Sequence, residues 1–292
     1  MIQFRSVWLL TTVALACVSF AADDKDTAAA RSAAKTTGPQ RGSLIAIGGG
    51  SLGADILDKF IELAGGTDAP IVYVPTAMPG DVANVRSGLV ESLKRRGCSD
   101  ITILHTRDRA VANSEAFIKP LKRARGVWFS GGRQLRFVDA YLNTRTVEAF
   151  RNVLKRGGVI AGSSAGATIQ GSYLVRGAPE GNQIMMAKGH EEGFAFLHNA
   201  AIDQHVIARR RLEDLIPVIR RHPELLGIGI DEGTAIVVQK NRFEVIGPSK
   251  VAIYDHARFD HGDGKPYFFL QAGDKFDLVK RRVIEHAEHR KP

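Results

Sequence analysis

Residues 159–167, with the sequence VIAGSSAGA, decide the fold of this chain. They combine a short apolar strand, a turn of small residues and the start of an apolar helical segment. Residues 162–166 fit the pattern G-x-S-x-G, in which a sharp turn lifts a serine above the edge of a sheet and leaves the next amide free to donate to an oxyanion. The pattern indicates Ser164 as nucleophile and the Ala165 amide as an oxyanion donor. Ser163 is the alternative nucleophile, and a turn that only caps the helix is the non-catalytic interpretation.

Short apolar runs alternate with amphipathic stretches through the N-terminal half of the chain. This alternation predicts strands at residues 44–47, 71–74, 101–104, 127–129 and 159–161, and helices at residues 54–64, 82–95, 114–122 and 135–155. Such an order is typical of an α/β fold with a mostly parallel sheet sandwiched by helices. After about Gly233, closely spaced β-like runs at residues 235–238, 243–246, 251–254 and 267–270 predict an antiparallel extension of the same sheet.

Composition and charge exclude several classes of protein. The chain has 292 residues, of which 44% are hydrophobic, so it can build a substantial core. Its 40 Lys and Arg against 31 Asp and Glu give a formal net charge of +9, which favours anionic partners. The basic residues are scattered in short pairs without interleaved aromatic residues, so the pattern does not favour nucleic acid as a partner.

The N-terminal segment has the composition of a leader. Residues 1–22 combine one basic residue, Arg5, with a short apolar run and two alanines, which is typical of a secretory signal peptide. The run is too short to span a bilayer, so the mature protein is expected to be secreted or periplasmic, without a membrane anchor. Lipidation at Cys17 is the alternative. Residues 23–41 are polar and predict a flexible leader, followed by a single α/β domain over residues 42–292.

A second Gly-rich turn follows the strand predicted at residues 127–129. Residues 129–134, FSGGRQ, close that strand and open a helix, so they lie at the carboxyl edge, where α/β proteins bind ligands. A phosphate-binding loop would need G-x-G-x-x-G or the lysine of a P-loop, and the turn has neither. The turn therefore favours a catalytic role, with the Gly132 amide completing an oxyanion hole and Gln134 contacting substrate.

A candidate base and a candidate acid occur in the C-terminal half. His205 follows an apolar stretch in the run DQH and is the best candidate for a general base among nine histidines. The apolar run at residues 227–230 ends in Asp231 and Glu232. A partly buried carboxylate needs a partner, which an imidazole supplies, so we expect Glu232 to orient His205, with Asp231 as the alternative. The order serine, histidine, acid differs from that of the α/β-hydrolases.

Four ordered motifs make the chain resemble a known family. FSGGRQ, GSSAGA, DQHVIARRR and GIGIDEGTA, within residues 42–282, are similar to motifs of the cyanophycinase-like serine peptidases, which are related to aspartyl dipeptidases and share a class I glutamine amidotransferase-like fold. The resemblance implies a serine hydrolase with Ser164 as nucleophile, His205 as base, Glu232 as acid, and amides near Gly132 and Ala165 as oxyanion donors. It also implies a homodimer that needs no metal or other cofactor. Amidotransferase chemistry is disfavoured because those enzymes use cysteine at the elbow.

The resemblance further implies a set of substrate-binding residues: Gln134, Asp203, Gln204, Arg209 and Arg211. Cyanophycin is a polyaspartate that carries arginine on its side-chain carboxylates, so each unit offers a carboxylate and a guanidinium. The two arginines are expected to bind carboxylates, while Asp203 or Gln134 is expected to bind the guanidinium.

Two departures from the family pattern bear on specificity. Asp214 stands where a third arginine is typical, and Arg133 stands where an acidic residue is frequent. The expected substrate is therefore cyanophycin or a related Asp/β-Asp peptide. An aspartyl-dipeptidase-like exopeptidase and a non-catalytic binding protein of the same fold are the alternatives.

Overall fold

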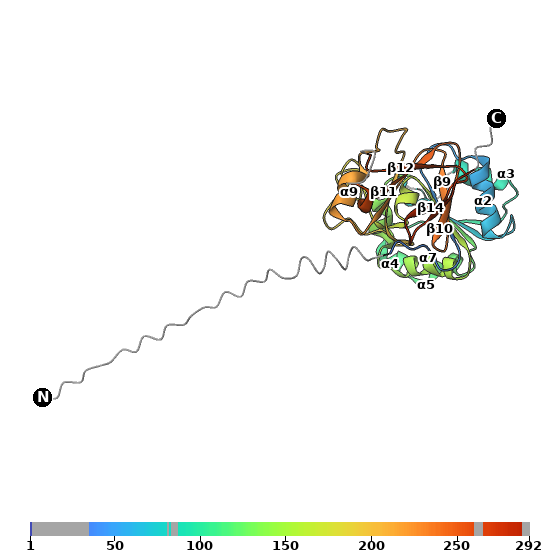
Figure 1. Ribbon diagram of the computed structural model, residues 1–292. Coiled ribbons are helices and arrows are strands. Elements are labelled where there is room, and N and C mark those ends of the chain that lie inside the picture. Colours follow the sequence, from blue (N-terminus) through green and yellow to red (C-terminus); the bar gives the residue numbers. More distant parts are fainter. Residues whose placement is uncertain (2–34, 81, 83–86, 260–264, 288–292) are drawn as a thin grey trace.

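The strands of the protein form two sheets with helices packed against them (Figure 1). The computed structural model describes residues 1, 35–80, 82, 87–259 and 265–287. The larger sheet has nine strands in the order β14-β13-β10-β9-β1-β5-β4-β2-β3, and the smaller has five in the order β12-β11-β8-β7-β6. The expected signal peptide beyond Met1 and most of the expected leader lie outside the described residues.

The first half of the chain builds the parallel part of the larger sheet. Its elements are β1 (Ser43–Ile47), α2 (Ala54–Ala64), β2 (Ile71–Val74), α3 (Gly88–Arg95), β3 (Ile101–Ile103), α4 (Arg109–Ala112), α5 (Glu115–Ile118), η1 (Lys119–Lys122), β4 (Gly126–Phe129), α6 (Leu135–Tyr141), α7 (Arg145–Lys155), β5 (Val159–Ser163) and α8 (Ala165–Thr168). Strands β1, β5, β4, β2 and β3 pair in parallel, which confirms the expected fold class. The helix expected at residues 135–155 is instead two helices, because Asn143 has a φ of 58° and Thr144 caps α7.

The second half of the chain contributes strands to both sheets. Its elements are β6 (Gly171–Tyr173), β7 (Leu197–Gln204), α9 (Leu215–Arg221), β8 (Leu226–Ile230), β9 (Ala235–Gln239), β10 (Arg242–Ile246), β11 (Lys250–Asp255), η2 (His256–Arg258), β12 (Phe268–Gln271), β13 (Lys275–Asp277) and β14 (Arg282–Glu285). Strands β9, β10, β13 and β14 extend the larger sheet in antiparallel fashion. The extension confirms the expectation for β9 and β10, whereas β13 and β14 lie beyond the runs that were expected to form strands.

The expectation that all C-terminal strands join one sheet is wrong for β11 and β12. β11 pairs with β8, and β12 pairs with β11, in the smaller sheet. The chain leaves the larger sheet at Gly247, which has a φ of +99° and whose added Cβ would lie 2.3 Å from the Gly233 carbonyl oxygen. A glycine is needed there because an L side chain fits neither the conformation nor the space.

Alternate residues of β1 point into two cores. Ile45 and Ile47 pack with apolar side chains of α2 and α3 on one face of the larger sheet. Leu44 and Ala46 face a cluster that includes side chains of α6, α7 and the inner face of the smaller sheet. A third cluster packs α9 against the outer face of the smaller sheet. The layers therefore bring the carboxyl end of β5 close to the ends of β7 and β8.

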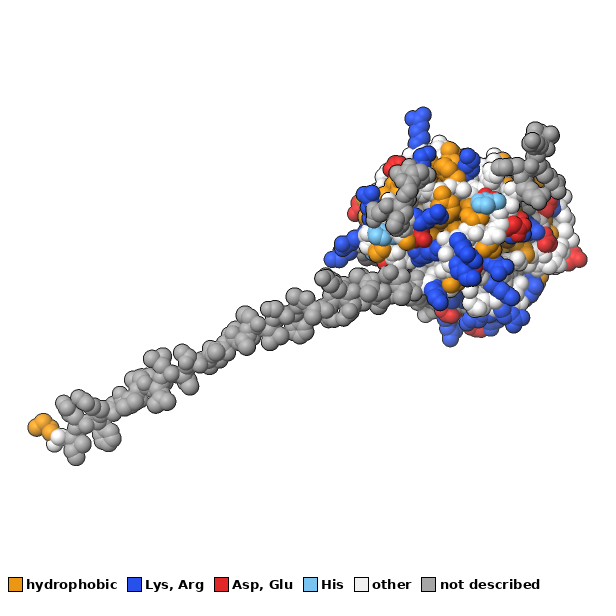
Figure 2. Space-filling view, in the orientation of Figure 1, with side chains coloured by type: hydrophobic (Ala, Val, Ile, Leu, Met, Phe, Trp, Pro, Cys, Tyr) orange, Lys and Arg blue, Asp and Glu red, His pale blue; other side chains and the backbone are white. Residues whose placement is uncertain are grey.

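The surface carries mixed charge. Lys and Arg side chains lie on several parts of the face in Figure 2, interspersed with hydrophobic and acidic side chains. None of the helices in the described part of the chain has both the length and the apolar character needed to span a lipid bilayer.

Candidate active site

The turn between β5 and α8 holds Ser164 in a strained conformation. Its φ is 56° and its ψ is −113°, values that cost a residue with a side chain about 1–3 kcal/mol. The two flanking glycines make the turn possible: a Cβ on Gly162 would lie 2.1 Å from the Gly166 carbonyl oxygen, and one on Gly166 would lie 2.4 Å from the Phe129 carbonyl oxygen. The Ser164 amide donates to the Ile47 carbonyl oxygen at the end of β1. The small residues of the motif are thus required by close backbone packing.

Three side chains from separate parts of the chain form one hydrogen-bonded line. Ser164 Oγ lies 2.9 Å from His205 Nε2. His205 Nδ1 lies 2.5 Å from Glu232 Oε1. When the Nδ1 hydrogen is donated to this carboxylate, Nε2 is left with its lone pair facing the serine hydroxyl. The arrangement is able to remove the hydroxyl proton as the oxygen attacks a carbonyl carbon.

Asp231, the alternative acid, faces other partners. Its carboxylate accepts hydrogen bonds from the amides of Ile207 and Ala208, at 3.0 and 2.9 Å, and from the Ser249 hydroxyl at 2.6 Å. Burial alone would raise the pKa of Asp231, but these hydrogen bonds outweigh it and lower the pKa below its ordinary value. Asp231 therefore fixes the loop that follows His205, and Glu232 is the acid in contact with the imidazole.

The environment of His205 favours the neutral imidazole. Burial lowers the pKa of His205 below 6.5, and the positive charges of Arg209 and Arg211 add to that effect. The hydrogen bond with Glu232 opposes both but does not cancel them. A neutral imidazole near pH 7 can accept a proton, as a general base must.

A run of glycines after β1 packs against the base and the acid. A Cβ on Gly49 would lie 2.1 Å from His205 Cε1, and one on Gly50 would lie 2.7 Å from Glu232 Cβ. The His205 amide also donates to the Gly48 carbonyl oxygen at 3.0 Å. This role of the glycines at residues 48–50 was not among the expectations from the sequence. The position of three glycines at the carboxyl end of a predicted strand was the available signal.

The two turns expected to supply oxyanion donors differ in how they approach the serine. Ala165 is the first residue of α8, where a helix leaves its amides without partners of its own. In the second turn, a Cβ on Gly131 would lie 3.5 Å from Ser164 Cβ. The next residue, Gly132, is exposed and has a φ of +137°, and its added Cβ would lie 2.1 Å from the Ala77 carbonyl oxygen. The second turn therefore brings backbone close to Ser164 at Gly131, and donation from the Gly132 amide to an oxyanion stays a prediction.

Two of the expected substrate-binding residues, Arg209 and Arg211, are at least partly exposed on the loop that follows His205. Arg209 is half exposed, and its Nε lies 3.8 Å from Glu232 Oε1. Arg211 is partly buried and donates to Gln204 Oε1 at 3.3 Å. Gln204 itself is buried, and its contact with the loop is this hydrogen bond from Arg211.

The other two expected substrate contacts point into the protein. Gln134 is fully buried, and its Nε2 donates to the Val175 carbonyl oxygen at 2.9 Å. Asp203 is also fully buried, and both of its carboxylate oxygens accept hydrogen bonds from Arg176. The expectation that either residue binds a guanidinium of the substrate does not fit this conformation. Arg176, which lies 27 positions before Asp203, was not among the residues expected at the site.

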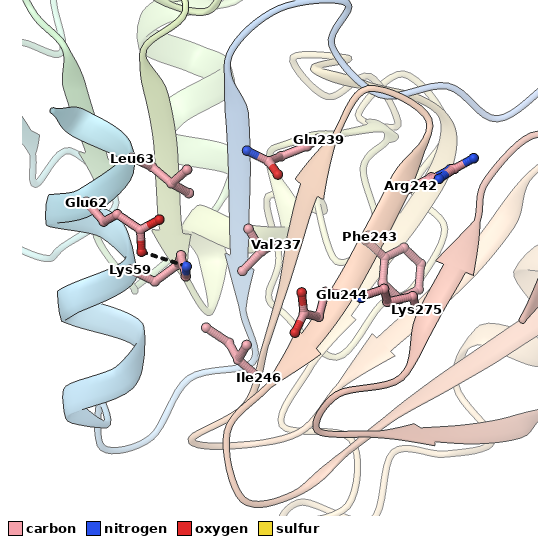
Figure 3. A pocket seen from close by; sticks show the side chains of 10 residues that line it. All are labelled: Lys59, Glu62, Leu63, Val237, Gln239, Arg242, Phe243, Glu244, Ile246 and Lys275. Carbon is pink, nitrogen blue, oxygen red and sulfur yellow. Dashed lines mark hydrogen bonds and ion pairs between the residues drawn. The ribbon is translucent and has the colours of Figure 1, made fainter. Parts of the chain in front are cut away.

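A separate pocket of about 300 Å³ lies between α2 and strands β9, β10 and β13 (Figure 3). Its rim carries the ion pair between Lys59 and Glu62. Ser164, His205 and Glu232 do not line it, so it is not the catalytic site.

Comparisons with known proteins show what the whole chain is similar to. Residues 44–246 match the sequence profile of "Peptidase family S51". The chain is 33% identical over 221 residues to a protein of Geminocystis herdmanii named "Cyanophycinase", with 74% of this chain and 81% of that protein covered. It is 30% identical over 258 residues to a protein of the same name from Trichormus variabilis, with 82% and 85% covered. The crystal structure of a peptidase from an acI-B1 Actinobacterium superposes with a TM-score of 0.60 at 25% identity and covers 82% of this chain and 98% of that one.

Proposed function

Because the chain belongs to peptidase family S51 and is a serine-type peptidase, we propose that it hydrolyses cyanophycin or related Asp/β-Asp peptides through an acyl-enzyme on Ser164. The hydrogen-bonded line from Ser164 through His205 to Glu232 is the observation that carries this proposal. Relatives named "Cyanophycinase" support the choice of substrate.

The proposed reaction begins with attack of Ser164 Oγ on the carbonyl carbon of the scissile bond. His205 Nε2 takes the hydroxyl proton, and Glu232 stabilises the resulting imidazolium. The amides of Ala165 and Gly132 donate to the oxyanion of the tetrahedral intermediate. The imidazolium then gives its proton to the leaving amine as the C–N bond breaks. Water, deprotonated by the same imidazole, releases the acyl group and restores the serine.

The charges near the serine suit an acidic peptide. Arg209 and Arg211 can each hold a carboxylate by paired hydrogen bonds. Each unit of cyanophycin carries a free carboxylate on its arginine, so the polymer supplies the group these side chains recognise. A peptide with a free Asp carboxylate supplies it too, which is why an aspartyl-dipeptidase-like activity is the second candidate.

Export and dimer formation are further parts of the proposal. The apolar segment at residues 1–22 supports secretion or periplasmic location, with removal near Ala21. N-terminal sequencing of the mature protein, after expression of the full chain in a host with an export pathway, tests it. Light scattering at several protein concentrations tests the homodimer, and a monomeric mass at all of them would refute it.

Product analysis tests catalysis and substrate together. The purified protein is incubated with cyanophycin, and the products are identified by mass spectrometry; β-Asp-Arg dipeptides are expected. Ser164→Ala should abolish their release, while Ser163→Ala, the matched control on the neighbouring serine, should retain it. Intact cyanophycin together with cleavage of short Asp peptides would favour the dipeptidase-like activity. Turnover by Ser164→Ala would refute the assigned nucleophile.

A further inference from the structure

A buried arginine, Arg176, pairs with two carboxylates that lie close to His205 in the sequence, those of Asp203 and Asp214. Arg176 is 1% exposed. Its Nε and Nη2 donate to the two carboxylate oxygens of Asp203 at 2.8 and 3.0 Å. Nη2 also lies 2.5 Å from Asp214 Oδ2, and Nη1 donates to the Asn182 carbonyl oxygen at 2.9 Å. Each of the three guanidinium nitrogens of Arg176 therefore has a hydrogen-bond partner inside the protein.

The two carboxylates stand at either end of the loop that carries the catalytic histidine. Asp203 is in β7, two residues before His205, and Asp214 precedes the first residue of α9. Burial alone would lower the pKa of Arg176, but the two carboxylates raise it, so the arginine stays charged. Removal of a single member of such a buried group leaves an uncompensated charge, which makes the pairing hard to displace.

Because Asp203 and Asp214 are paired with Arg176, the charged side chains that remain for a ligand are mainly arginines. Arg209 is half exposed beside the histidine, and Arg211 lies within the same loop. Among the residues that the structure describes, no carboxylate lies within ion-pair distance of Arg211. A ligand in the site therefore meets cationic side chains, while Asp203 and Asp214 already hold a guanidinium.

We infer that Arg176 is a specificity-determining residue, because it fills the guanidinium site formed by Asp203 and Asp214. The enzyme therefore binds the carboxylate of each substrate unit and does not bind the guanidinium of that unit. The inference rests on the proposed function, because it specifies which half of the arginyl group is recognised. It requires that the enzyme hydrolyse a substrate whose guanidinium is replaced by a neutral group about as fast as the arginine substrate. It also requires that removal of Arg176 create a preference for guanidinium.

Matched synthetic oligomers test the inference with the native enzyme. One is a short cyanophycin segment, and the other has citrulline in place of arginine, which keeps the size and the carboxylate but removes the charge. The native enzyme should hydrolyse both with kcat/KM values within about threefold of each other. A preference of more than about tenfold for the arginine oligomer would overturn the inference, since a charge-assisted pair with the guanidinium would then be formed.

Arg176→Ala supplies the reverse test. Freed of their internal partner, Asp203 and Asp214 should bind the substrate guanidinium, so the preference for arginine over citrulline should rise roughly tenfold or more. An unchanged ratio in a folded Arg176→Ala protein would overturn the inference. Arg281→Ala is the matched control, because Arg281 is also largely buried and pairs with Asp255 at 3.0 Å, at the opposite end of the strands of the smaller sheet from Asp203. It should lower the unfolding temperature without changing the ratio.

Failure of the proposed substrate gives a different result. If neither oligomer is hydrolysed, cyanophycin is not the substrate, and the same ratio is measured on Asp-Arg and Asp-citrulline dipeptides. The criteria are the same for that pair. The native ratio decides the question even if Arg176→Ala fails to fold, because it needs no variant.

Discussion

Replacement of Gly49 by alanine tests whether the glycine run after β1 positions the catalytic imidazole. A Cβ at residue 49 would lie 2.1 Å from Cε1, 2.6 Å from Nε2 and 2.8 Å from Nδ1 of His205. Carbon atoms in contact lie about 3.5–4.0 Å apart, so the ring must move by roughly 1.4 Å. The 2.9 Å contact between Nε2 and Ser164 Oγ cannot survive that movement. We therefore expect kcat to fall about 100-fold, the cost of a displacement of about 1 Å in an active site.

The same substitution also strains the backbone, and the assay must separate the two effects. Gly49 has a φ of +104°, so alanine there costs about 1–3 kcal/mol of folding free energy. Gly66 is the matched control, because it has a φ of +102° with no atom within 4 Å of an added Cβ. Both variants should unfold at a lower temperature, but only Gly49→Ala should lose activity in steady-state hydrolysis at a temperature where both are folded.

Two results would refute this reasoning. A folded Gly49→Ala protein with kcat within about threefold of the native value would mean that the imidazole is not held where the structure has it. Equal loss of activity in Gly66→Ala would mean that strain in the fold, rather than contact with His205, limits turnover.

Further predictions concern the acid and the pH dependence of the base. Glu232→Gln should lower kcat roughly 1000-fold, because it removes the anion that stabilises the imidazolium. Asp231→Asn should mainly lower the free energy of unfolding, by about 1–2 kcal/mol, because it weakens the hydrogen bonds with the amides of residues 207 and 208. The reverse pattern in kinetics and chemical denaturation would make Asp231 the orienting acid. Because burial lowers the pKa of His205, kcat/KM should fall on the acid side with a midpoint below 6.5, and Arg209→Ala should move that midpoint upward by removing a neighbouring positive charge. His205 takes up a proton more readily in the unfolded chain than in the folded protein. Its contribution to the free energy of unfolding should therefore be present above pH 6.5 and be lost as the pH falls through the pKa of the folded state. Denaturation at a series of pH values measures this loss.

The periodicity of the sequence predicts the elements that depend on local pattern. β2 and α2 have the predicted bounds, because β2 is a continuous apolar run between two prolines and α2 is an amphipathic run between two glycines. The sheet to which β11 and β12 belong is not a local property. Their apolar character satisfies either sheet, and the bend at Gly247 decides which one they join.

Motif and spacing similarly predict the reactive side chains of the site but not the buried residues that pack around them. The elbow pattern points to Ser164, and the run DQH points to His205, since each is a chemical group in a short and specific context. Arg176 has no such context. It lies after β6 and pairs with carboxylates 27 and 38 positions later, so only the register of the smaller sheet reveals that it fills the place expected for a ligand.

The strain at the catalytic residues explains why two sheets are needed to build the site. Ser164 and His205 both have positive φ, at 56° and 59°, and such conformations persist only where the surroundings hold them. The Ser164 amide donates to the carbonyl oxygen of Ile47, and the His205 amide donates to that of Gly48. Neighbouring carbonyl groups at the end of β1 thus fix the serine from the larger sheet and the histidine from the smaller one. The distance between nucleophile and base is therefore set by backbone hydrogen bonds to a single dipeptide, and the glycines that follow it must stay small for the imidazole to lie there.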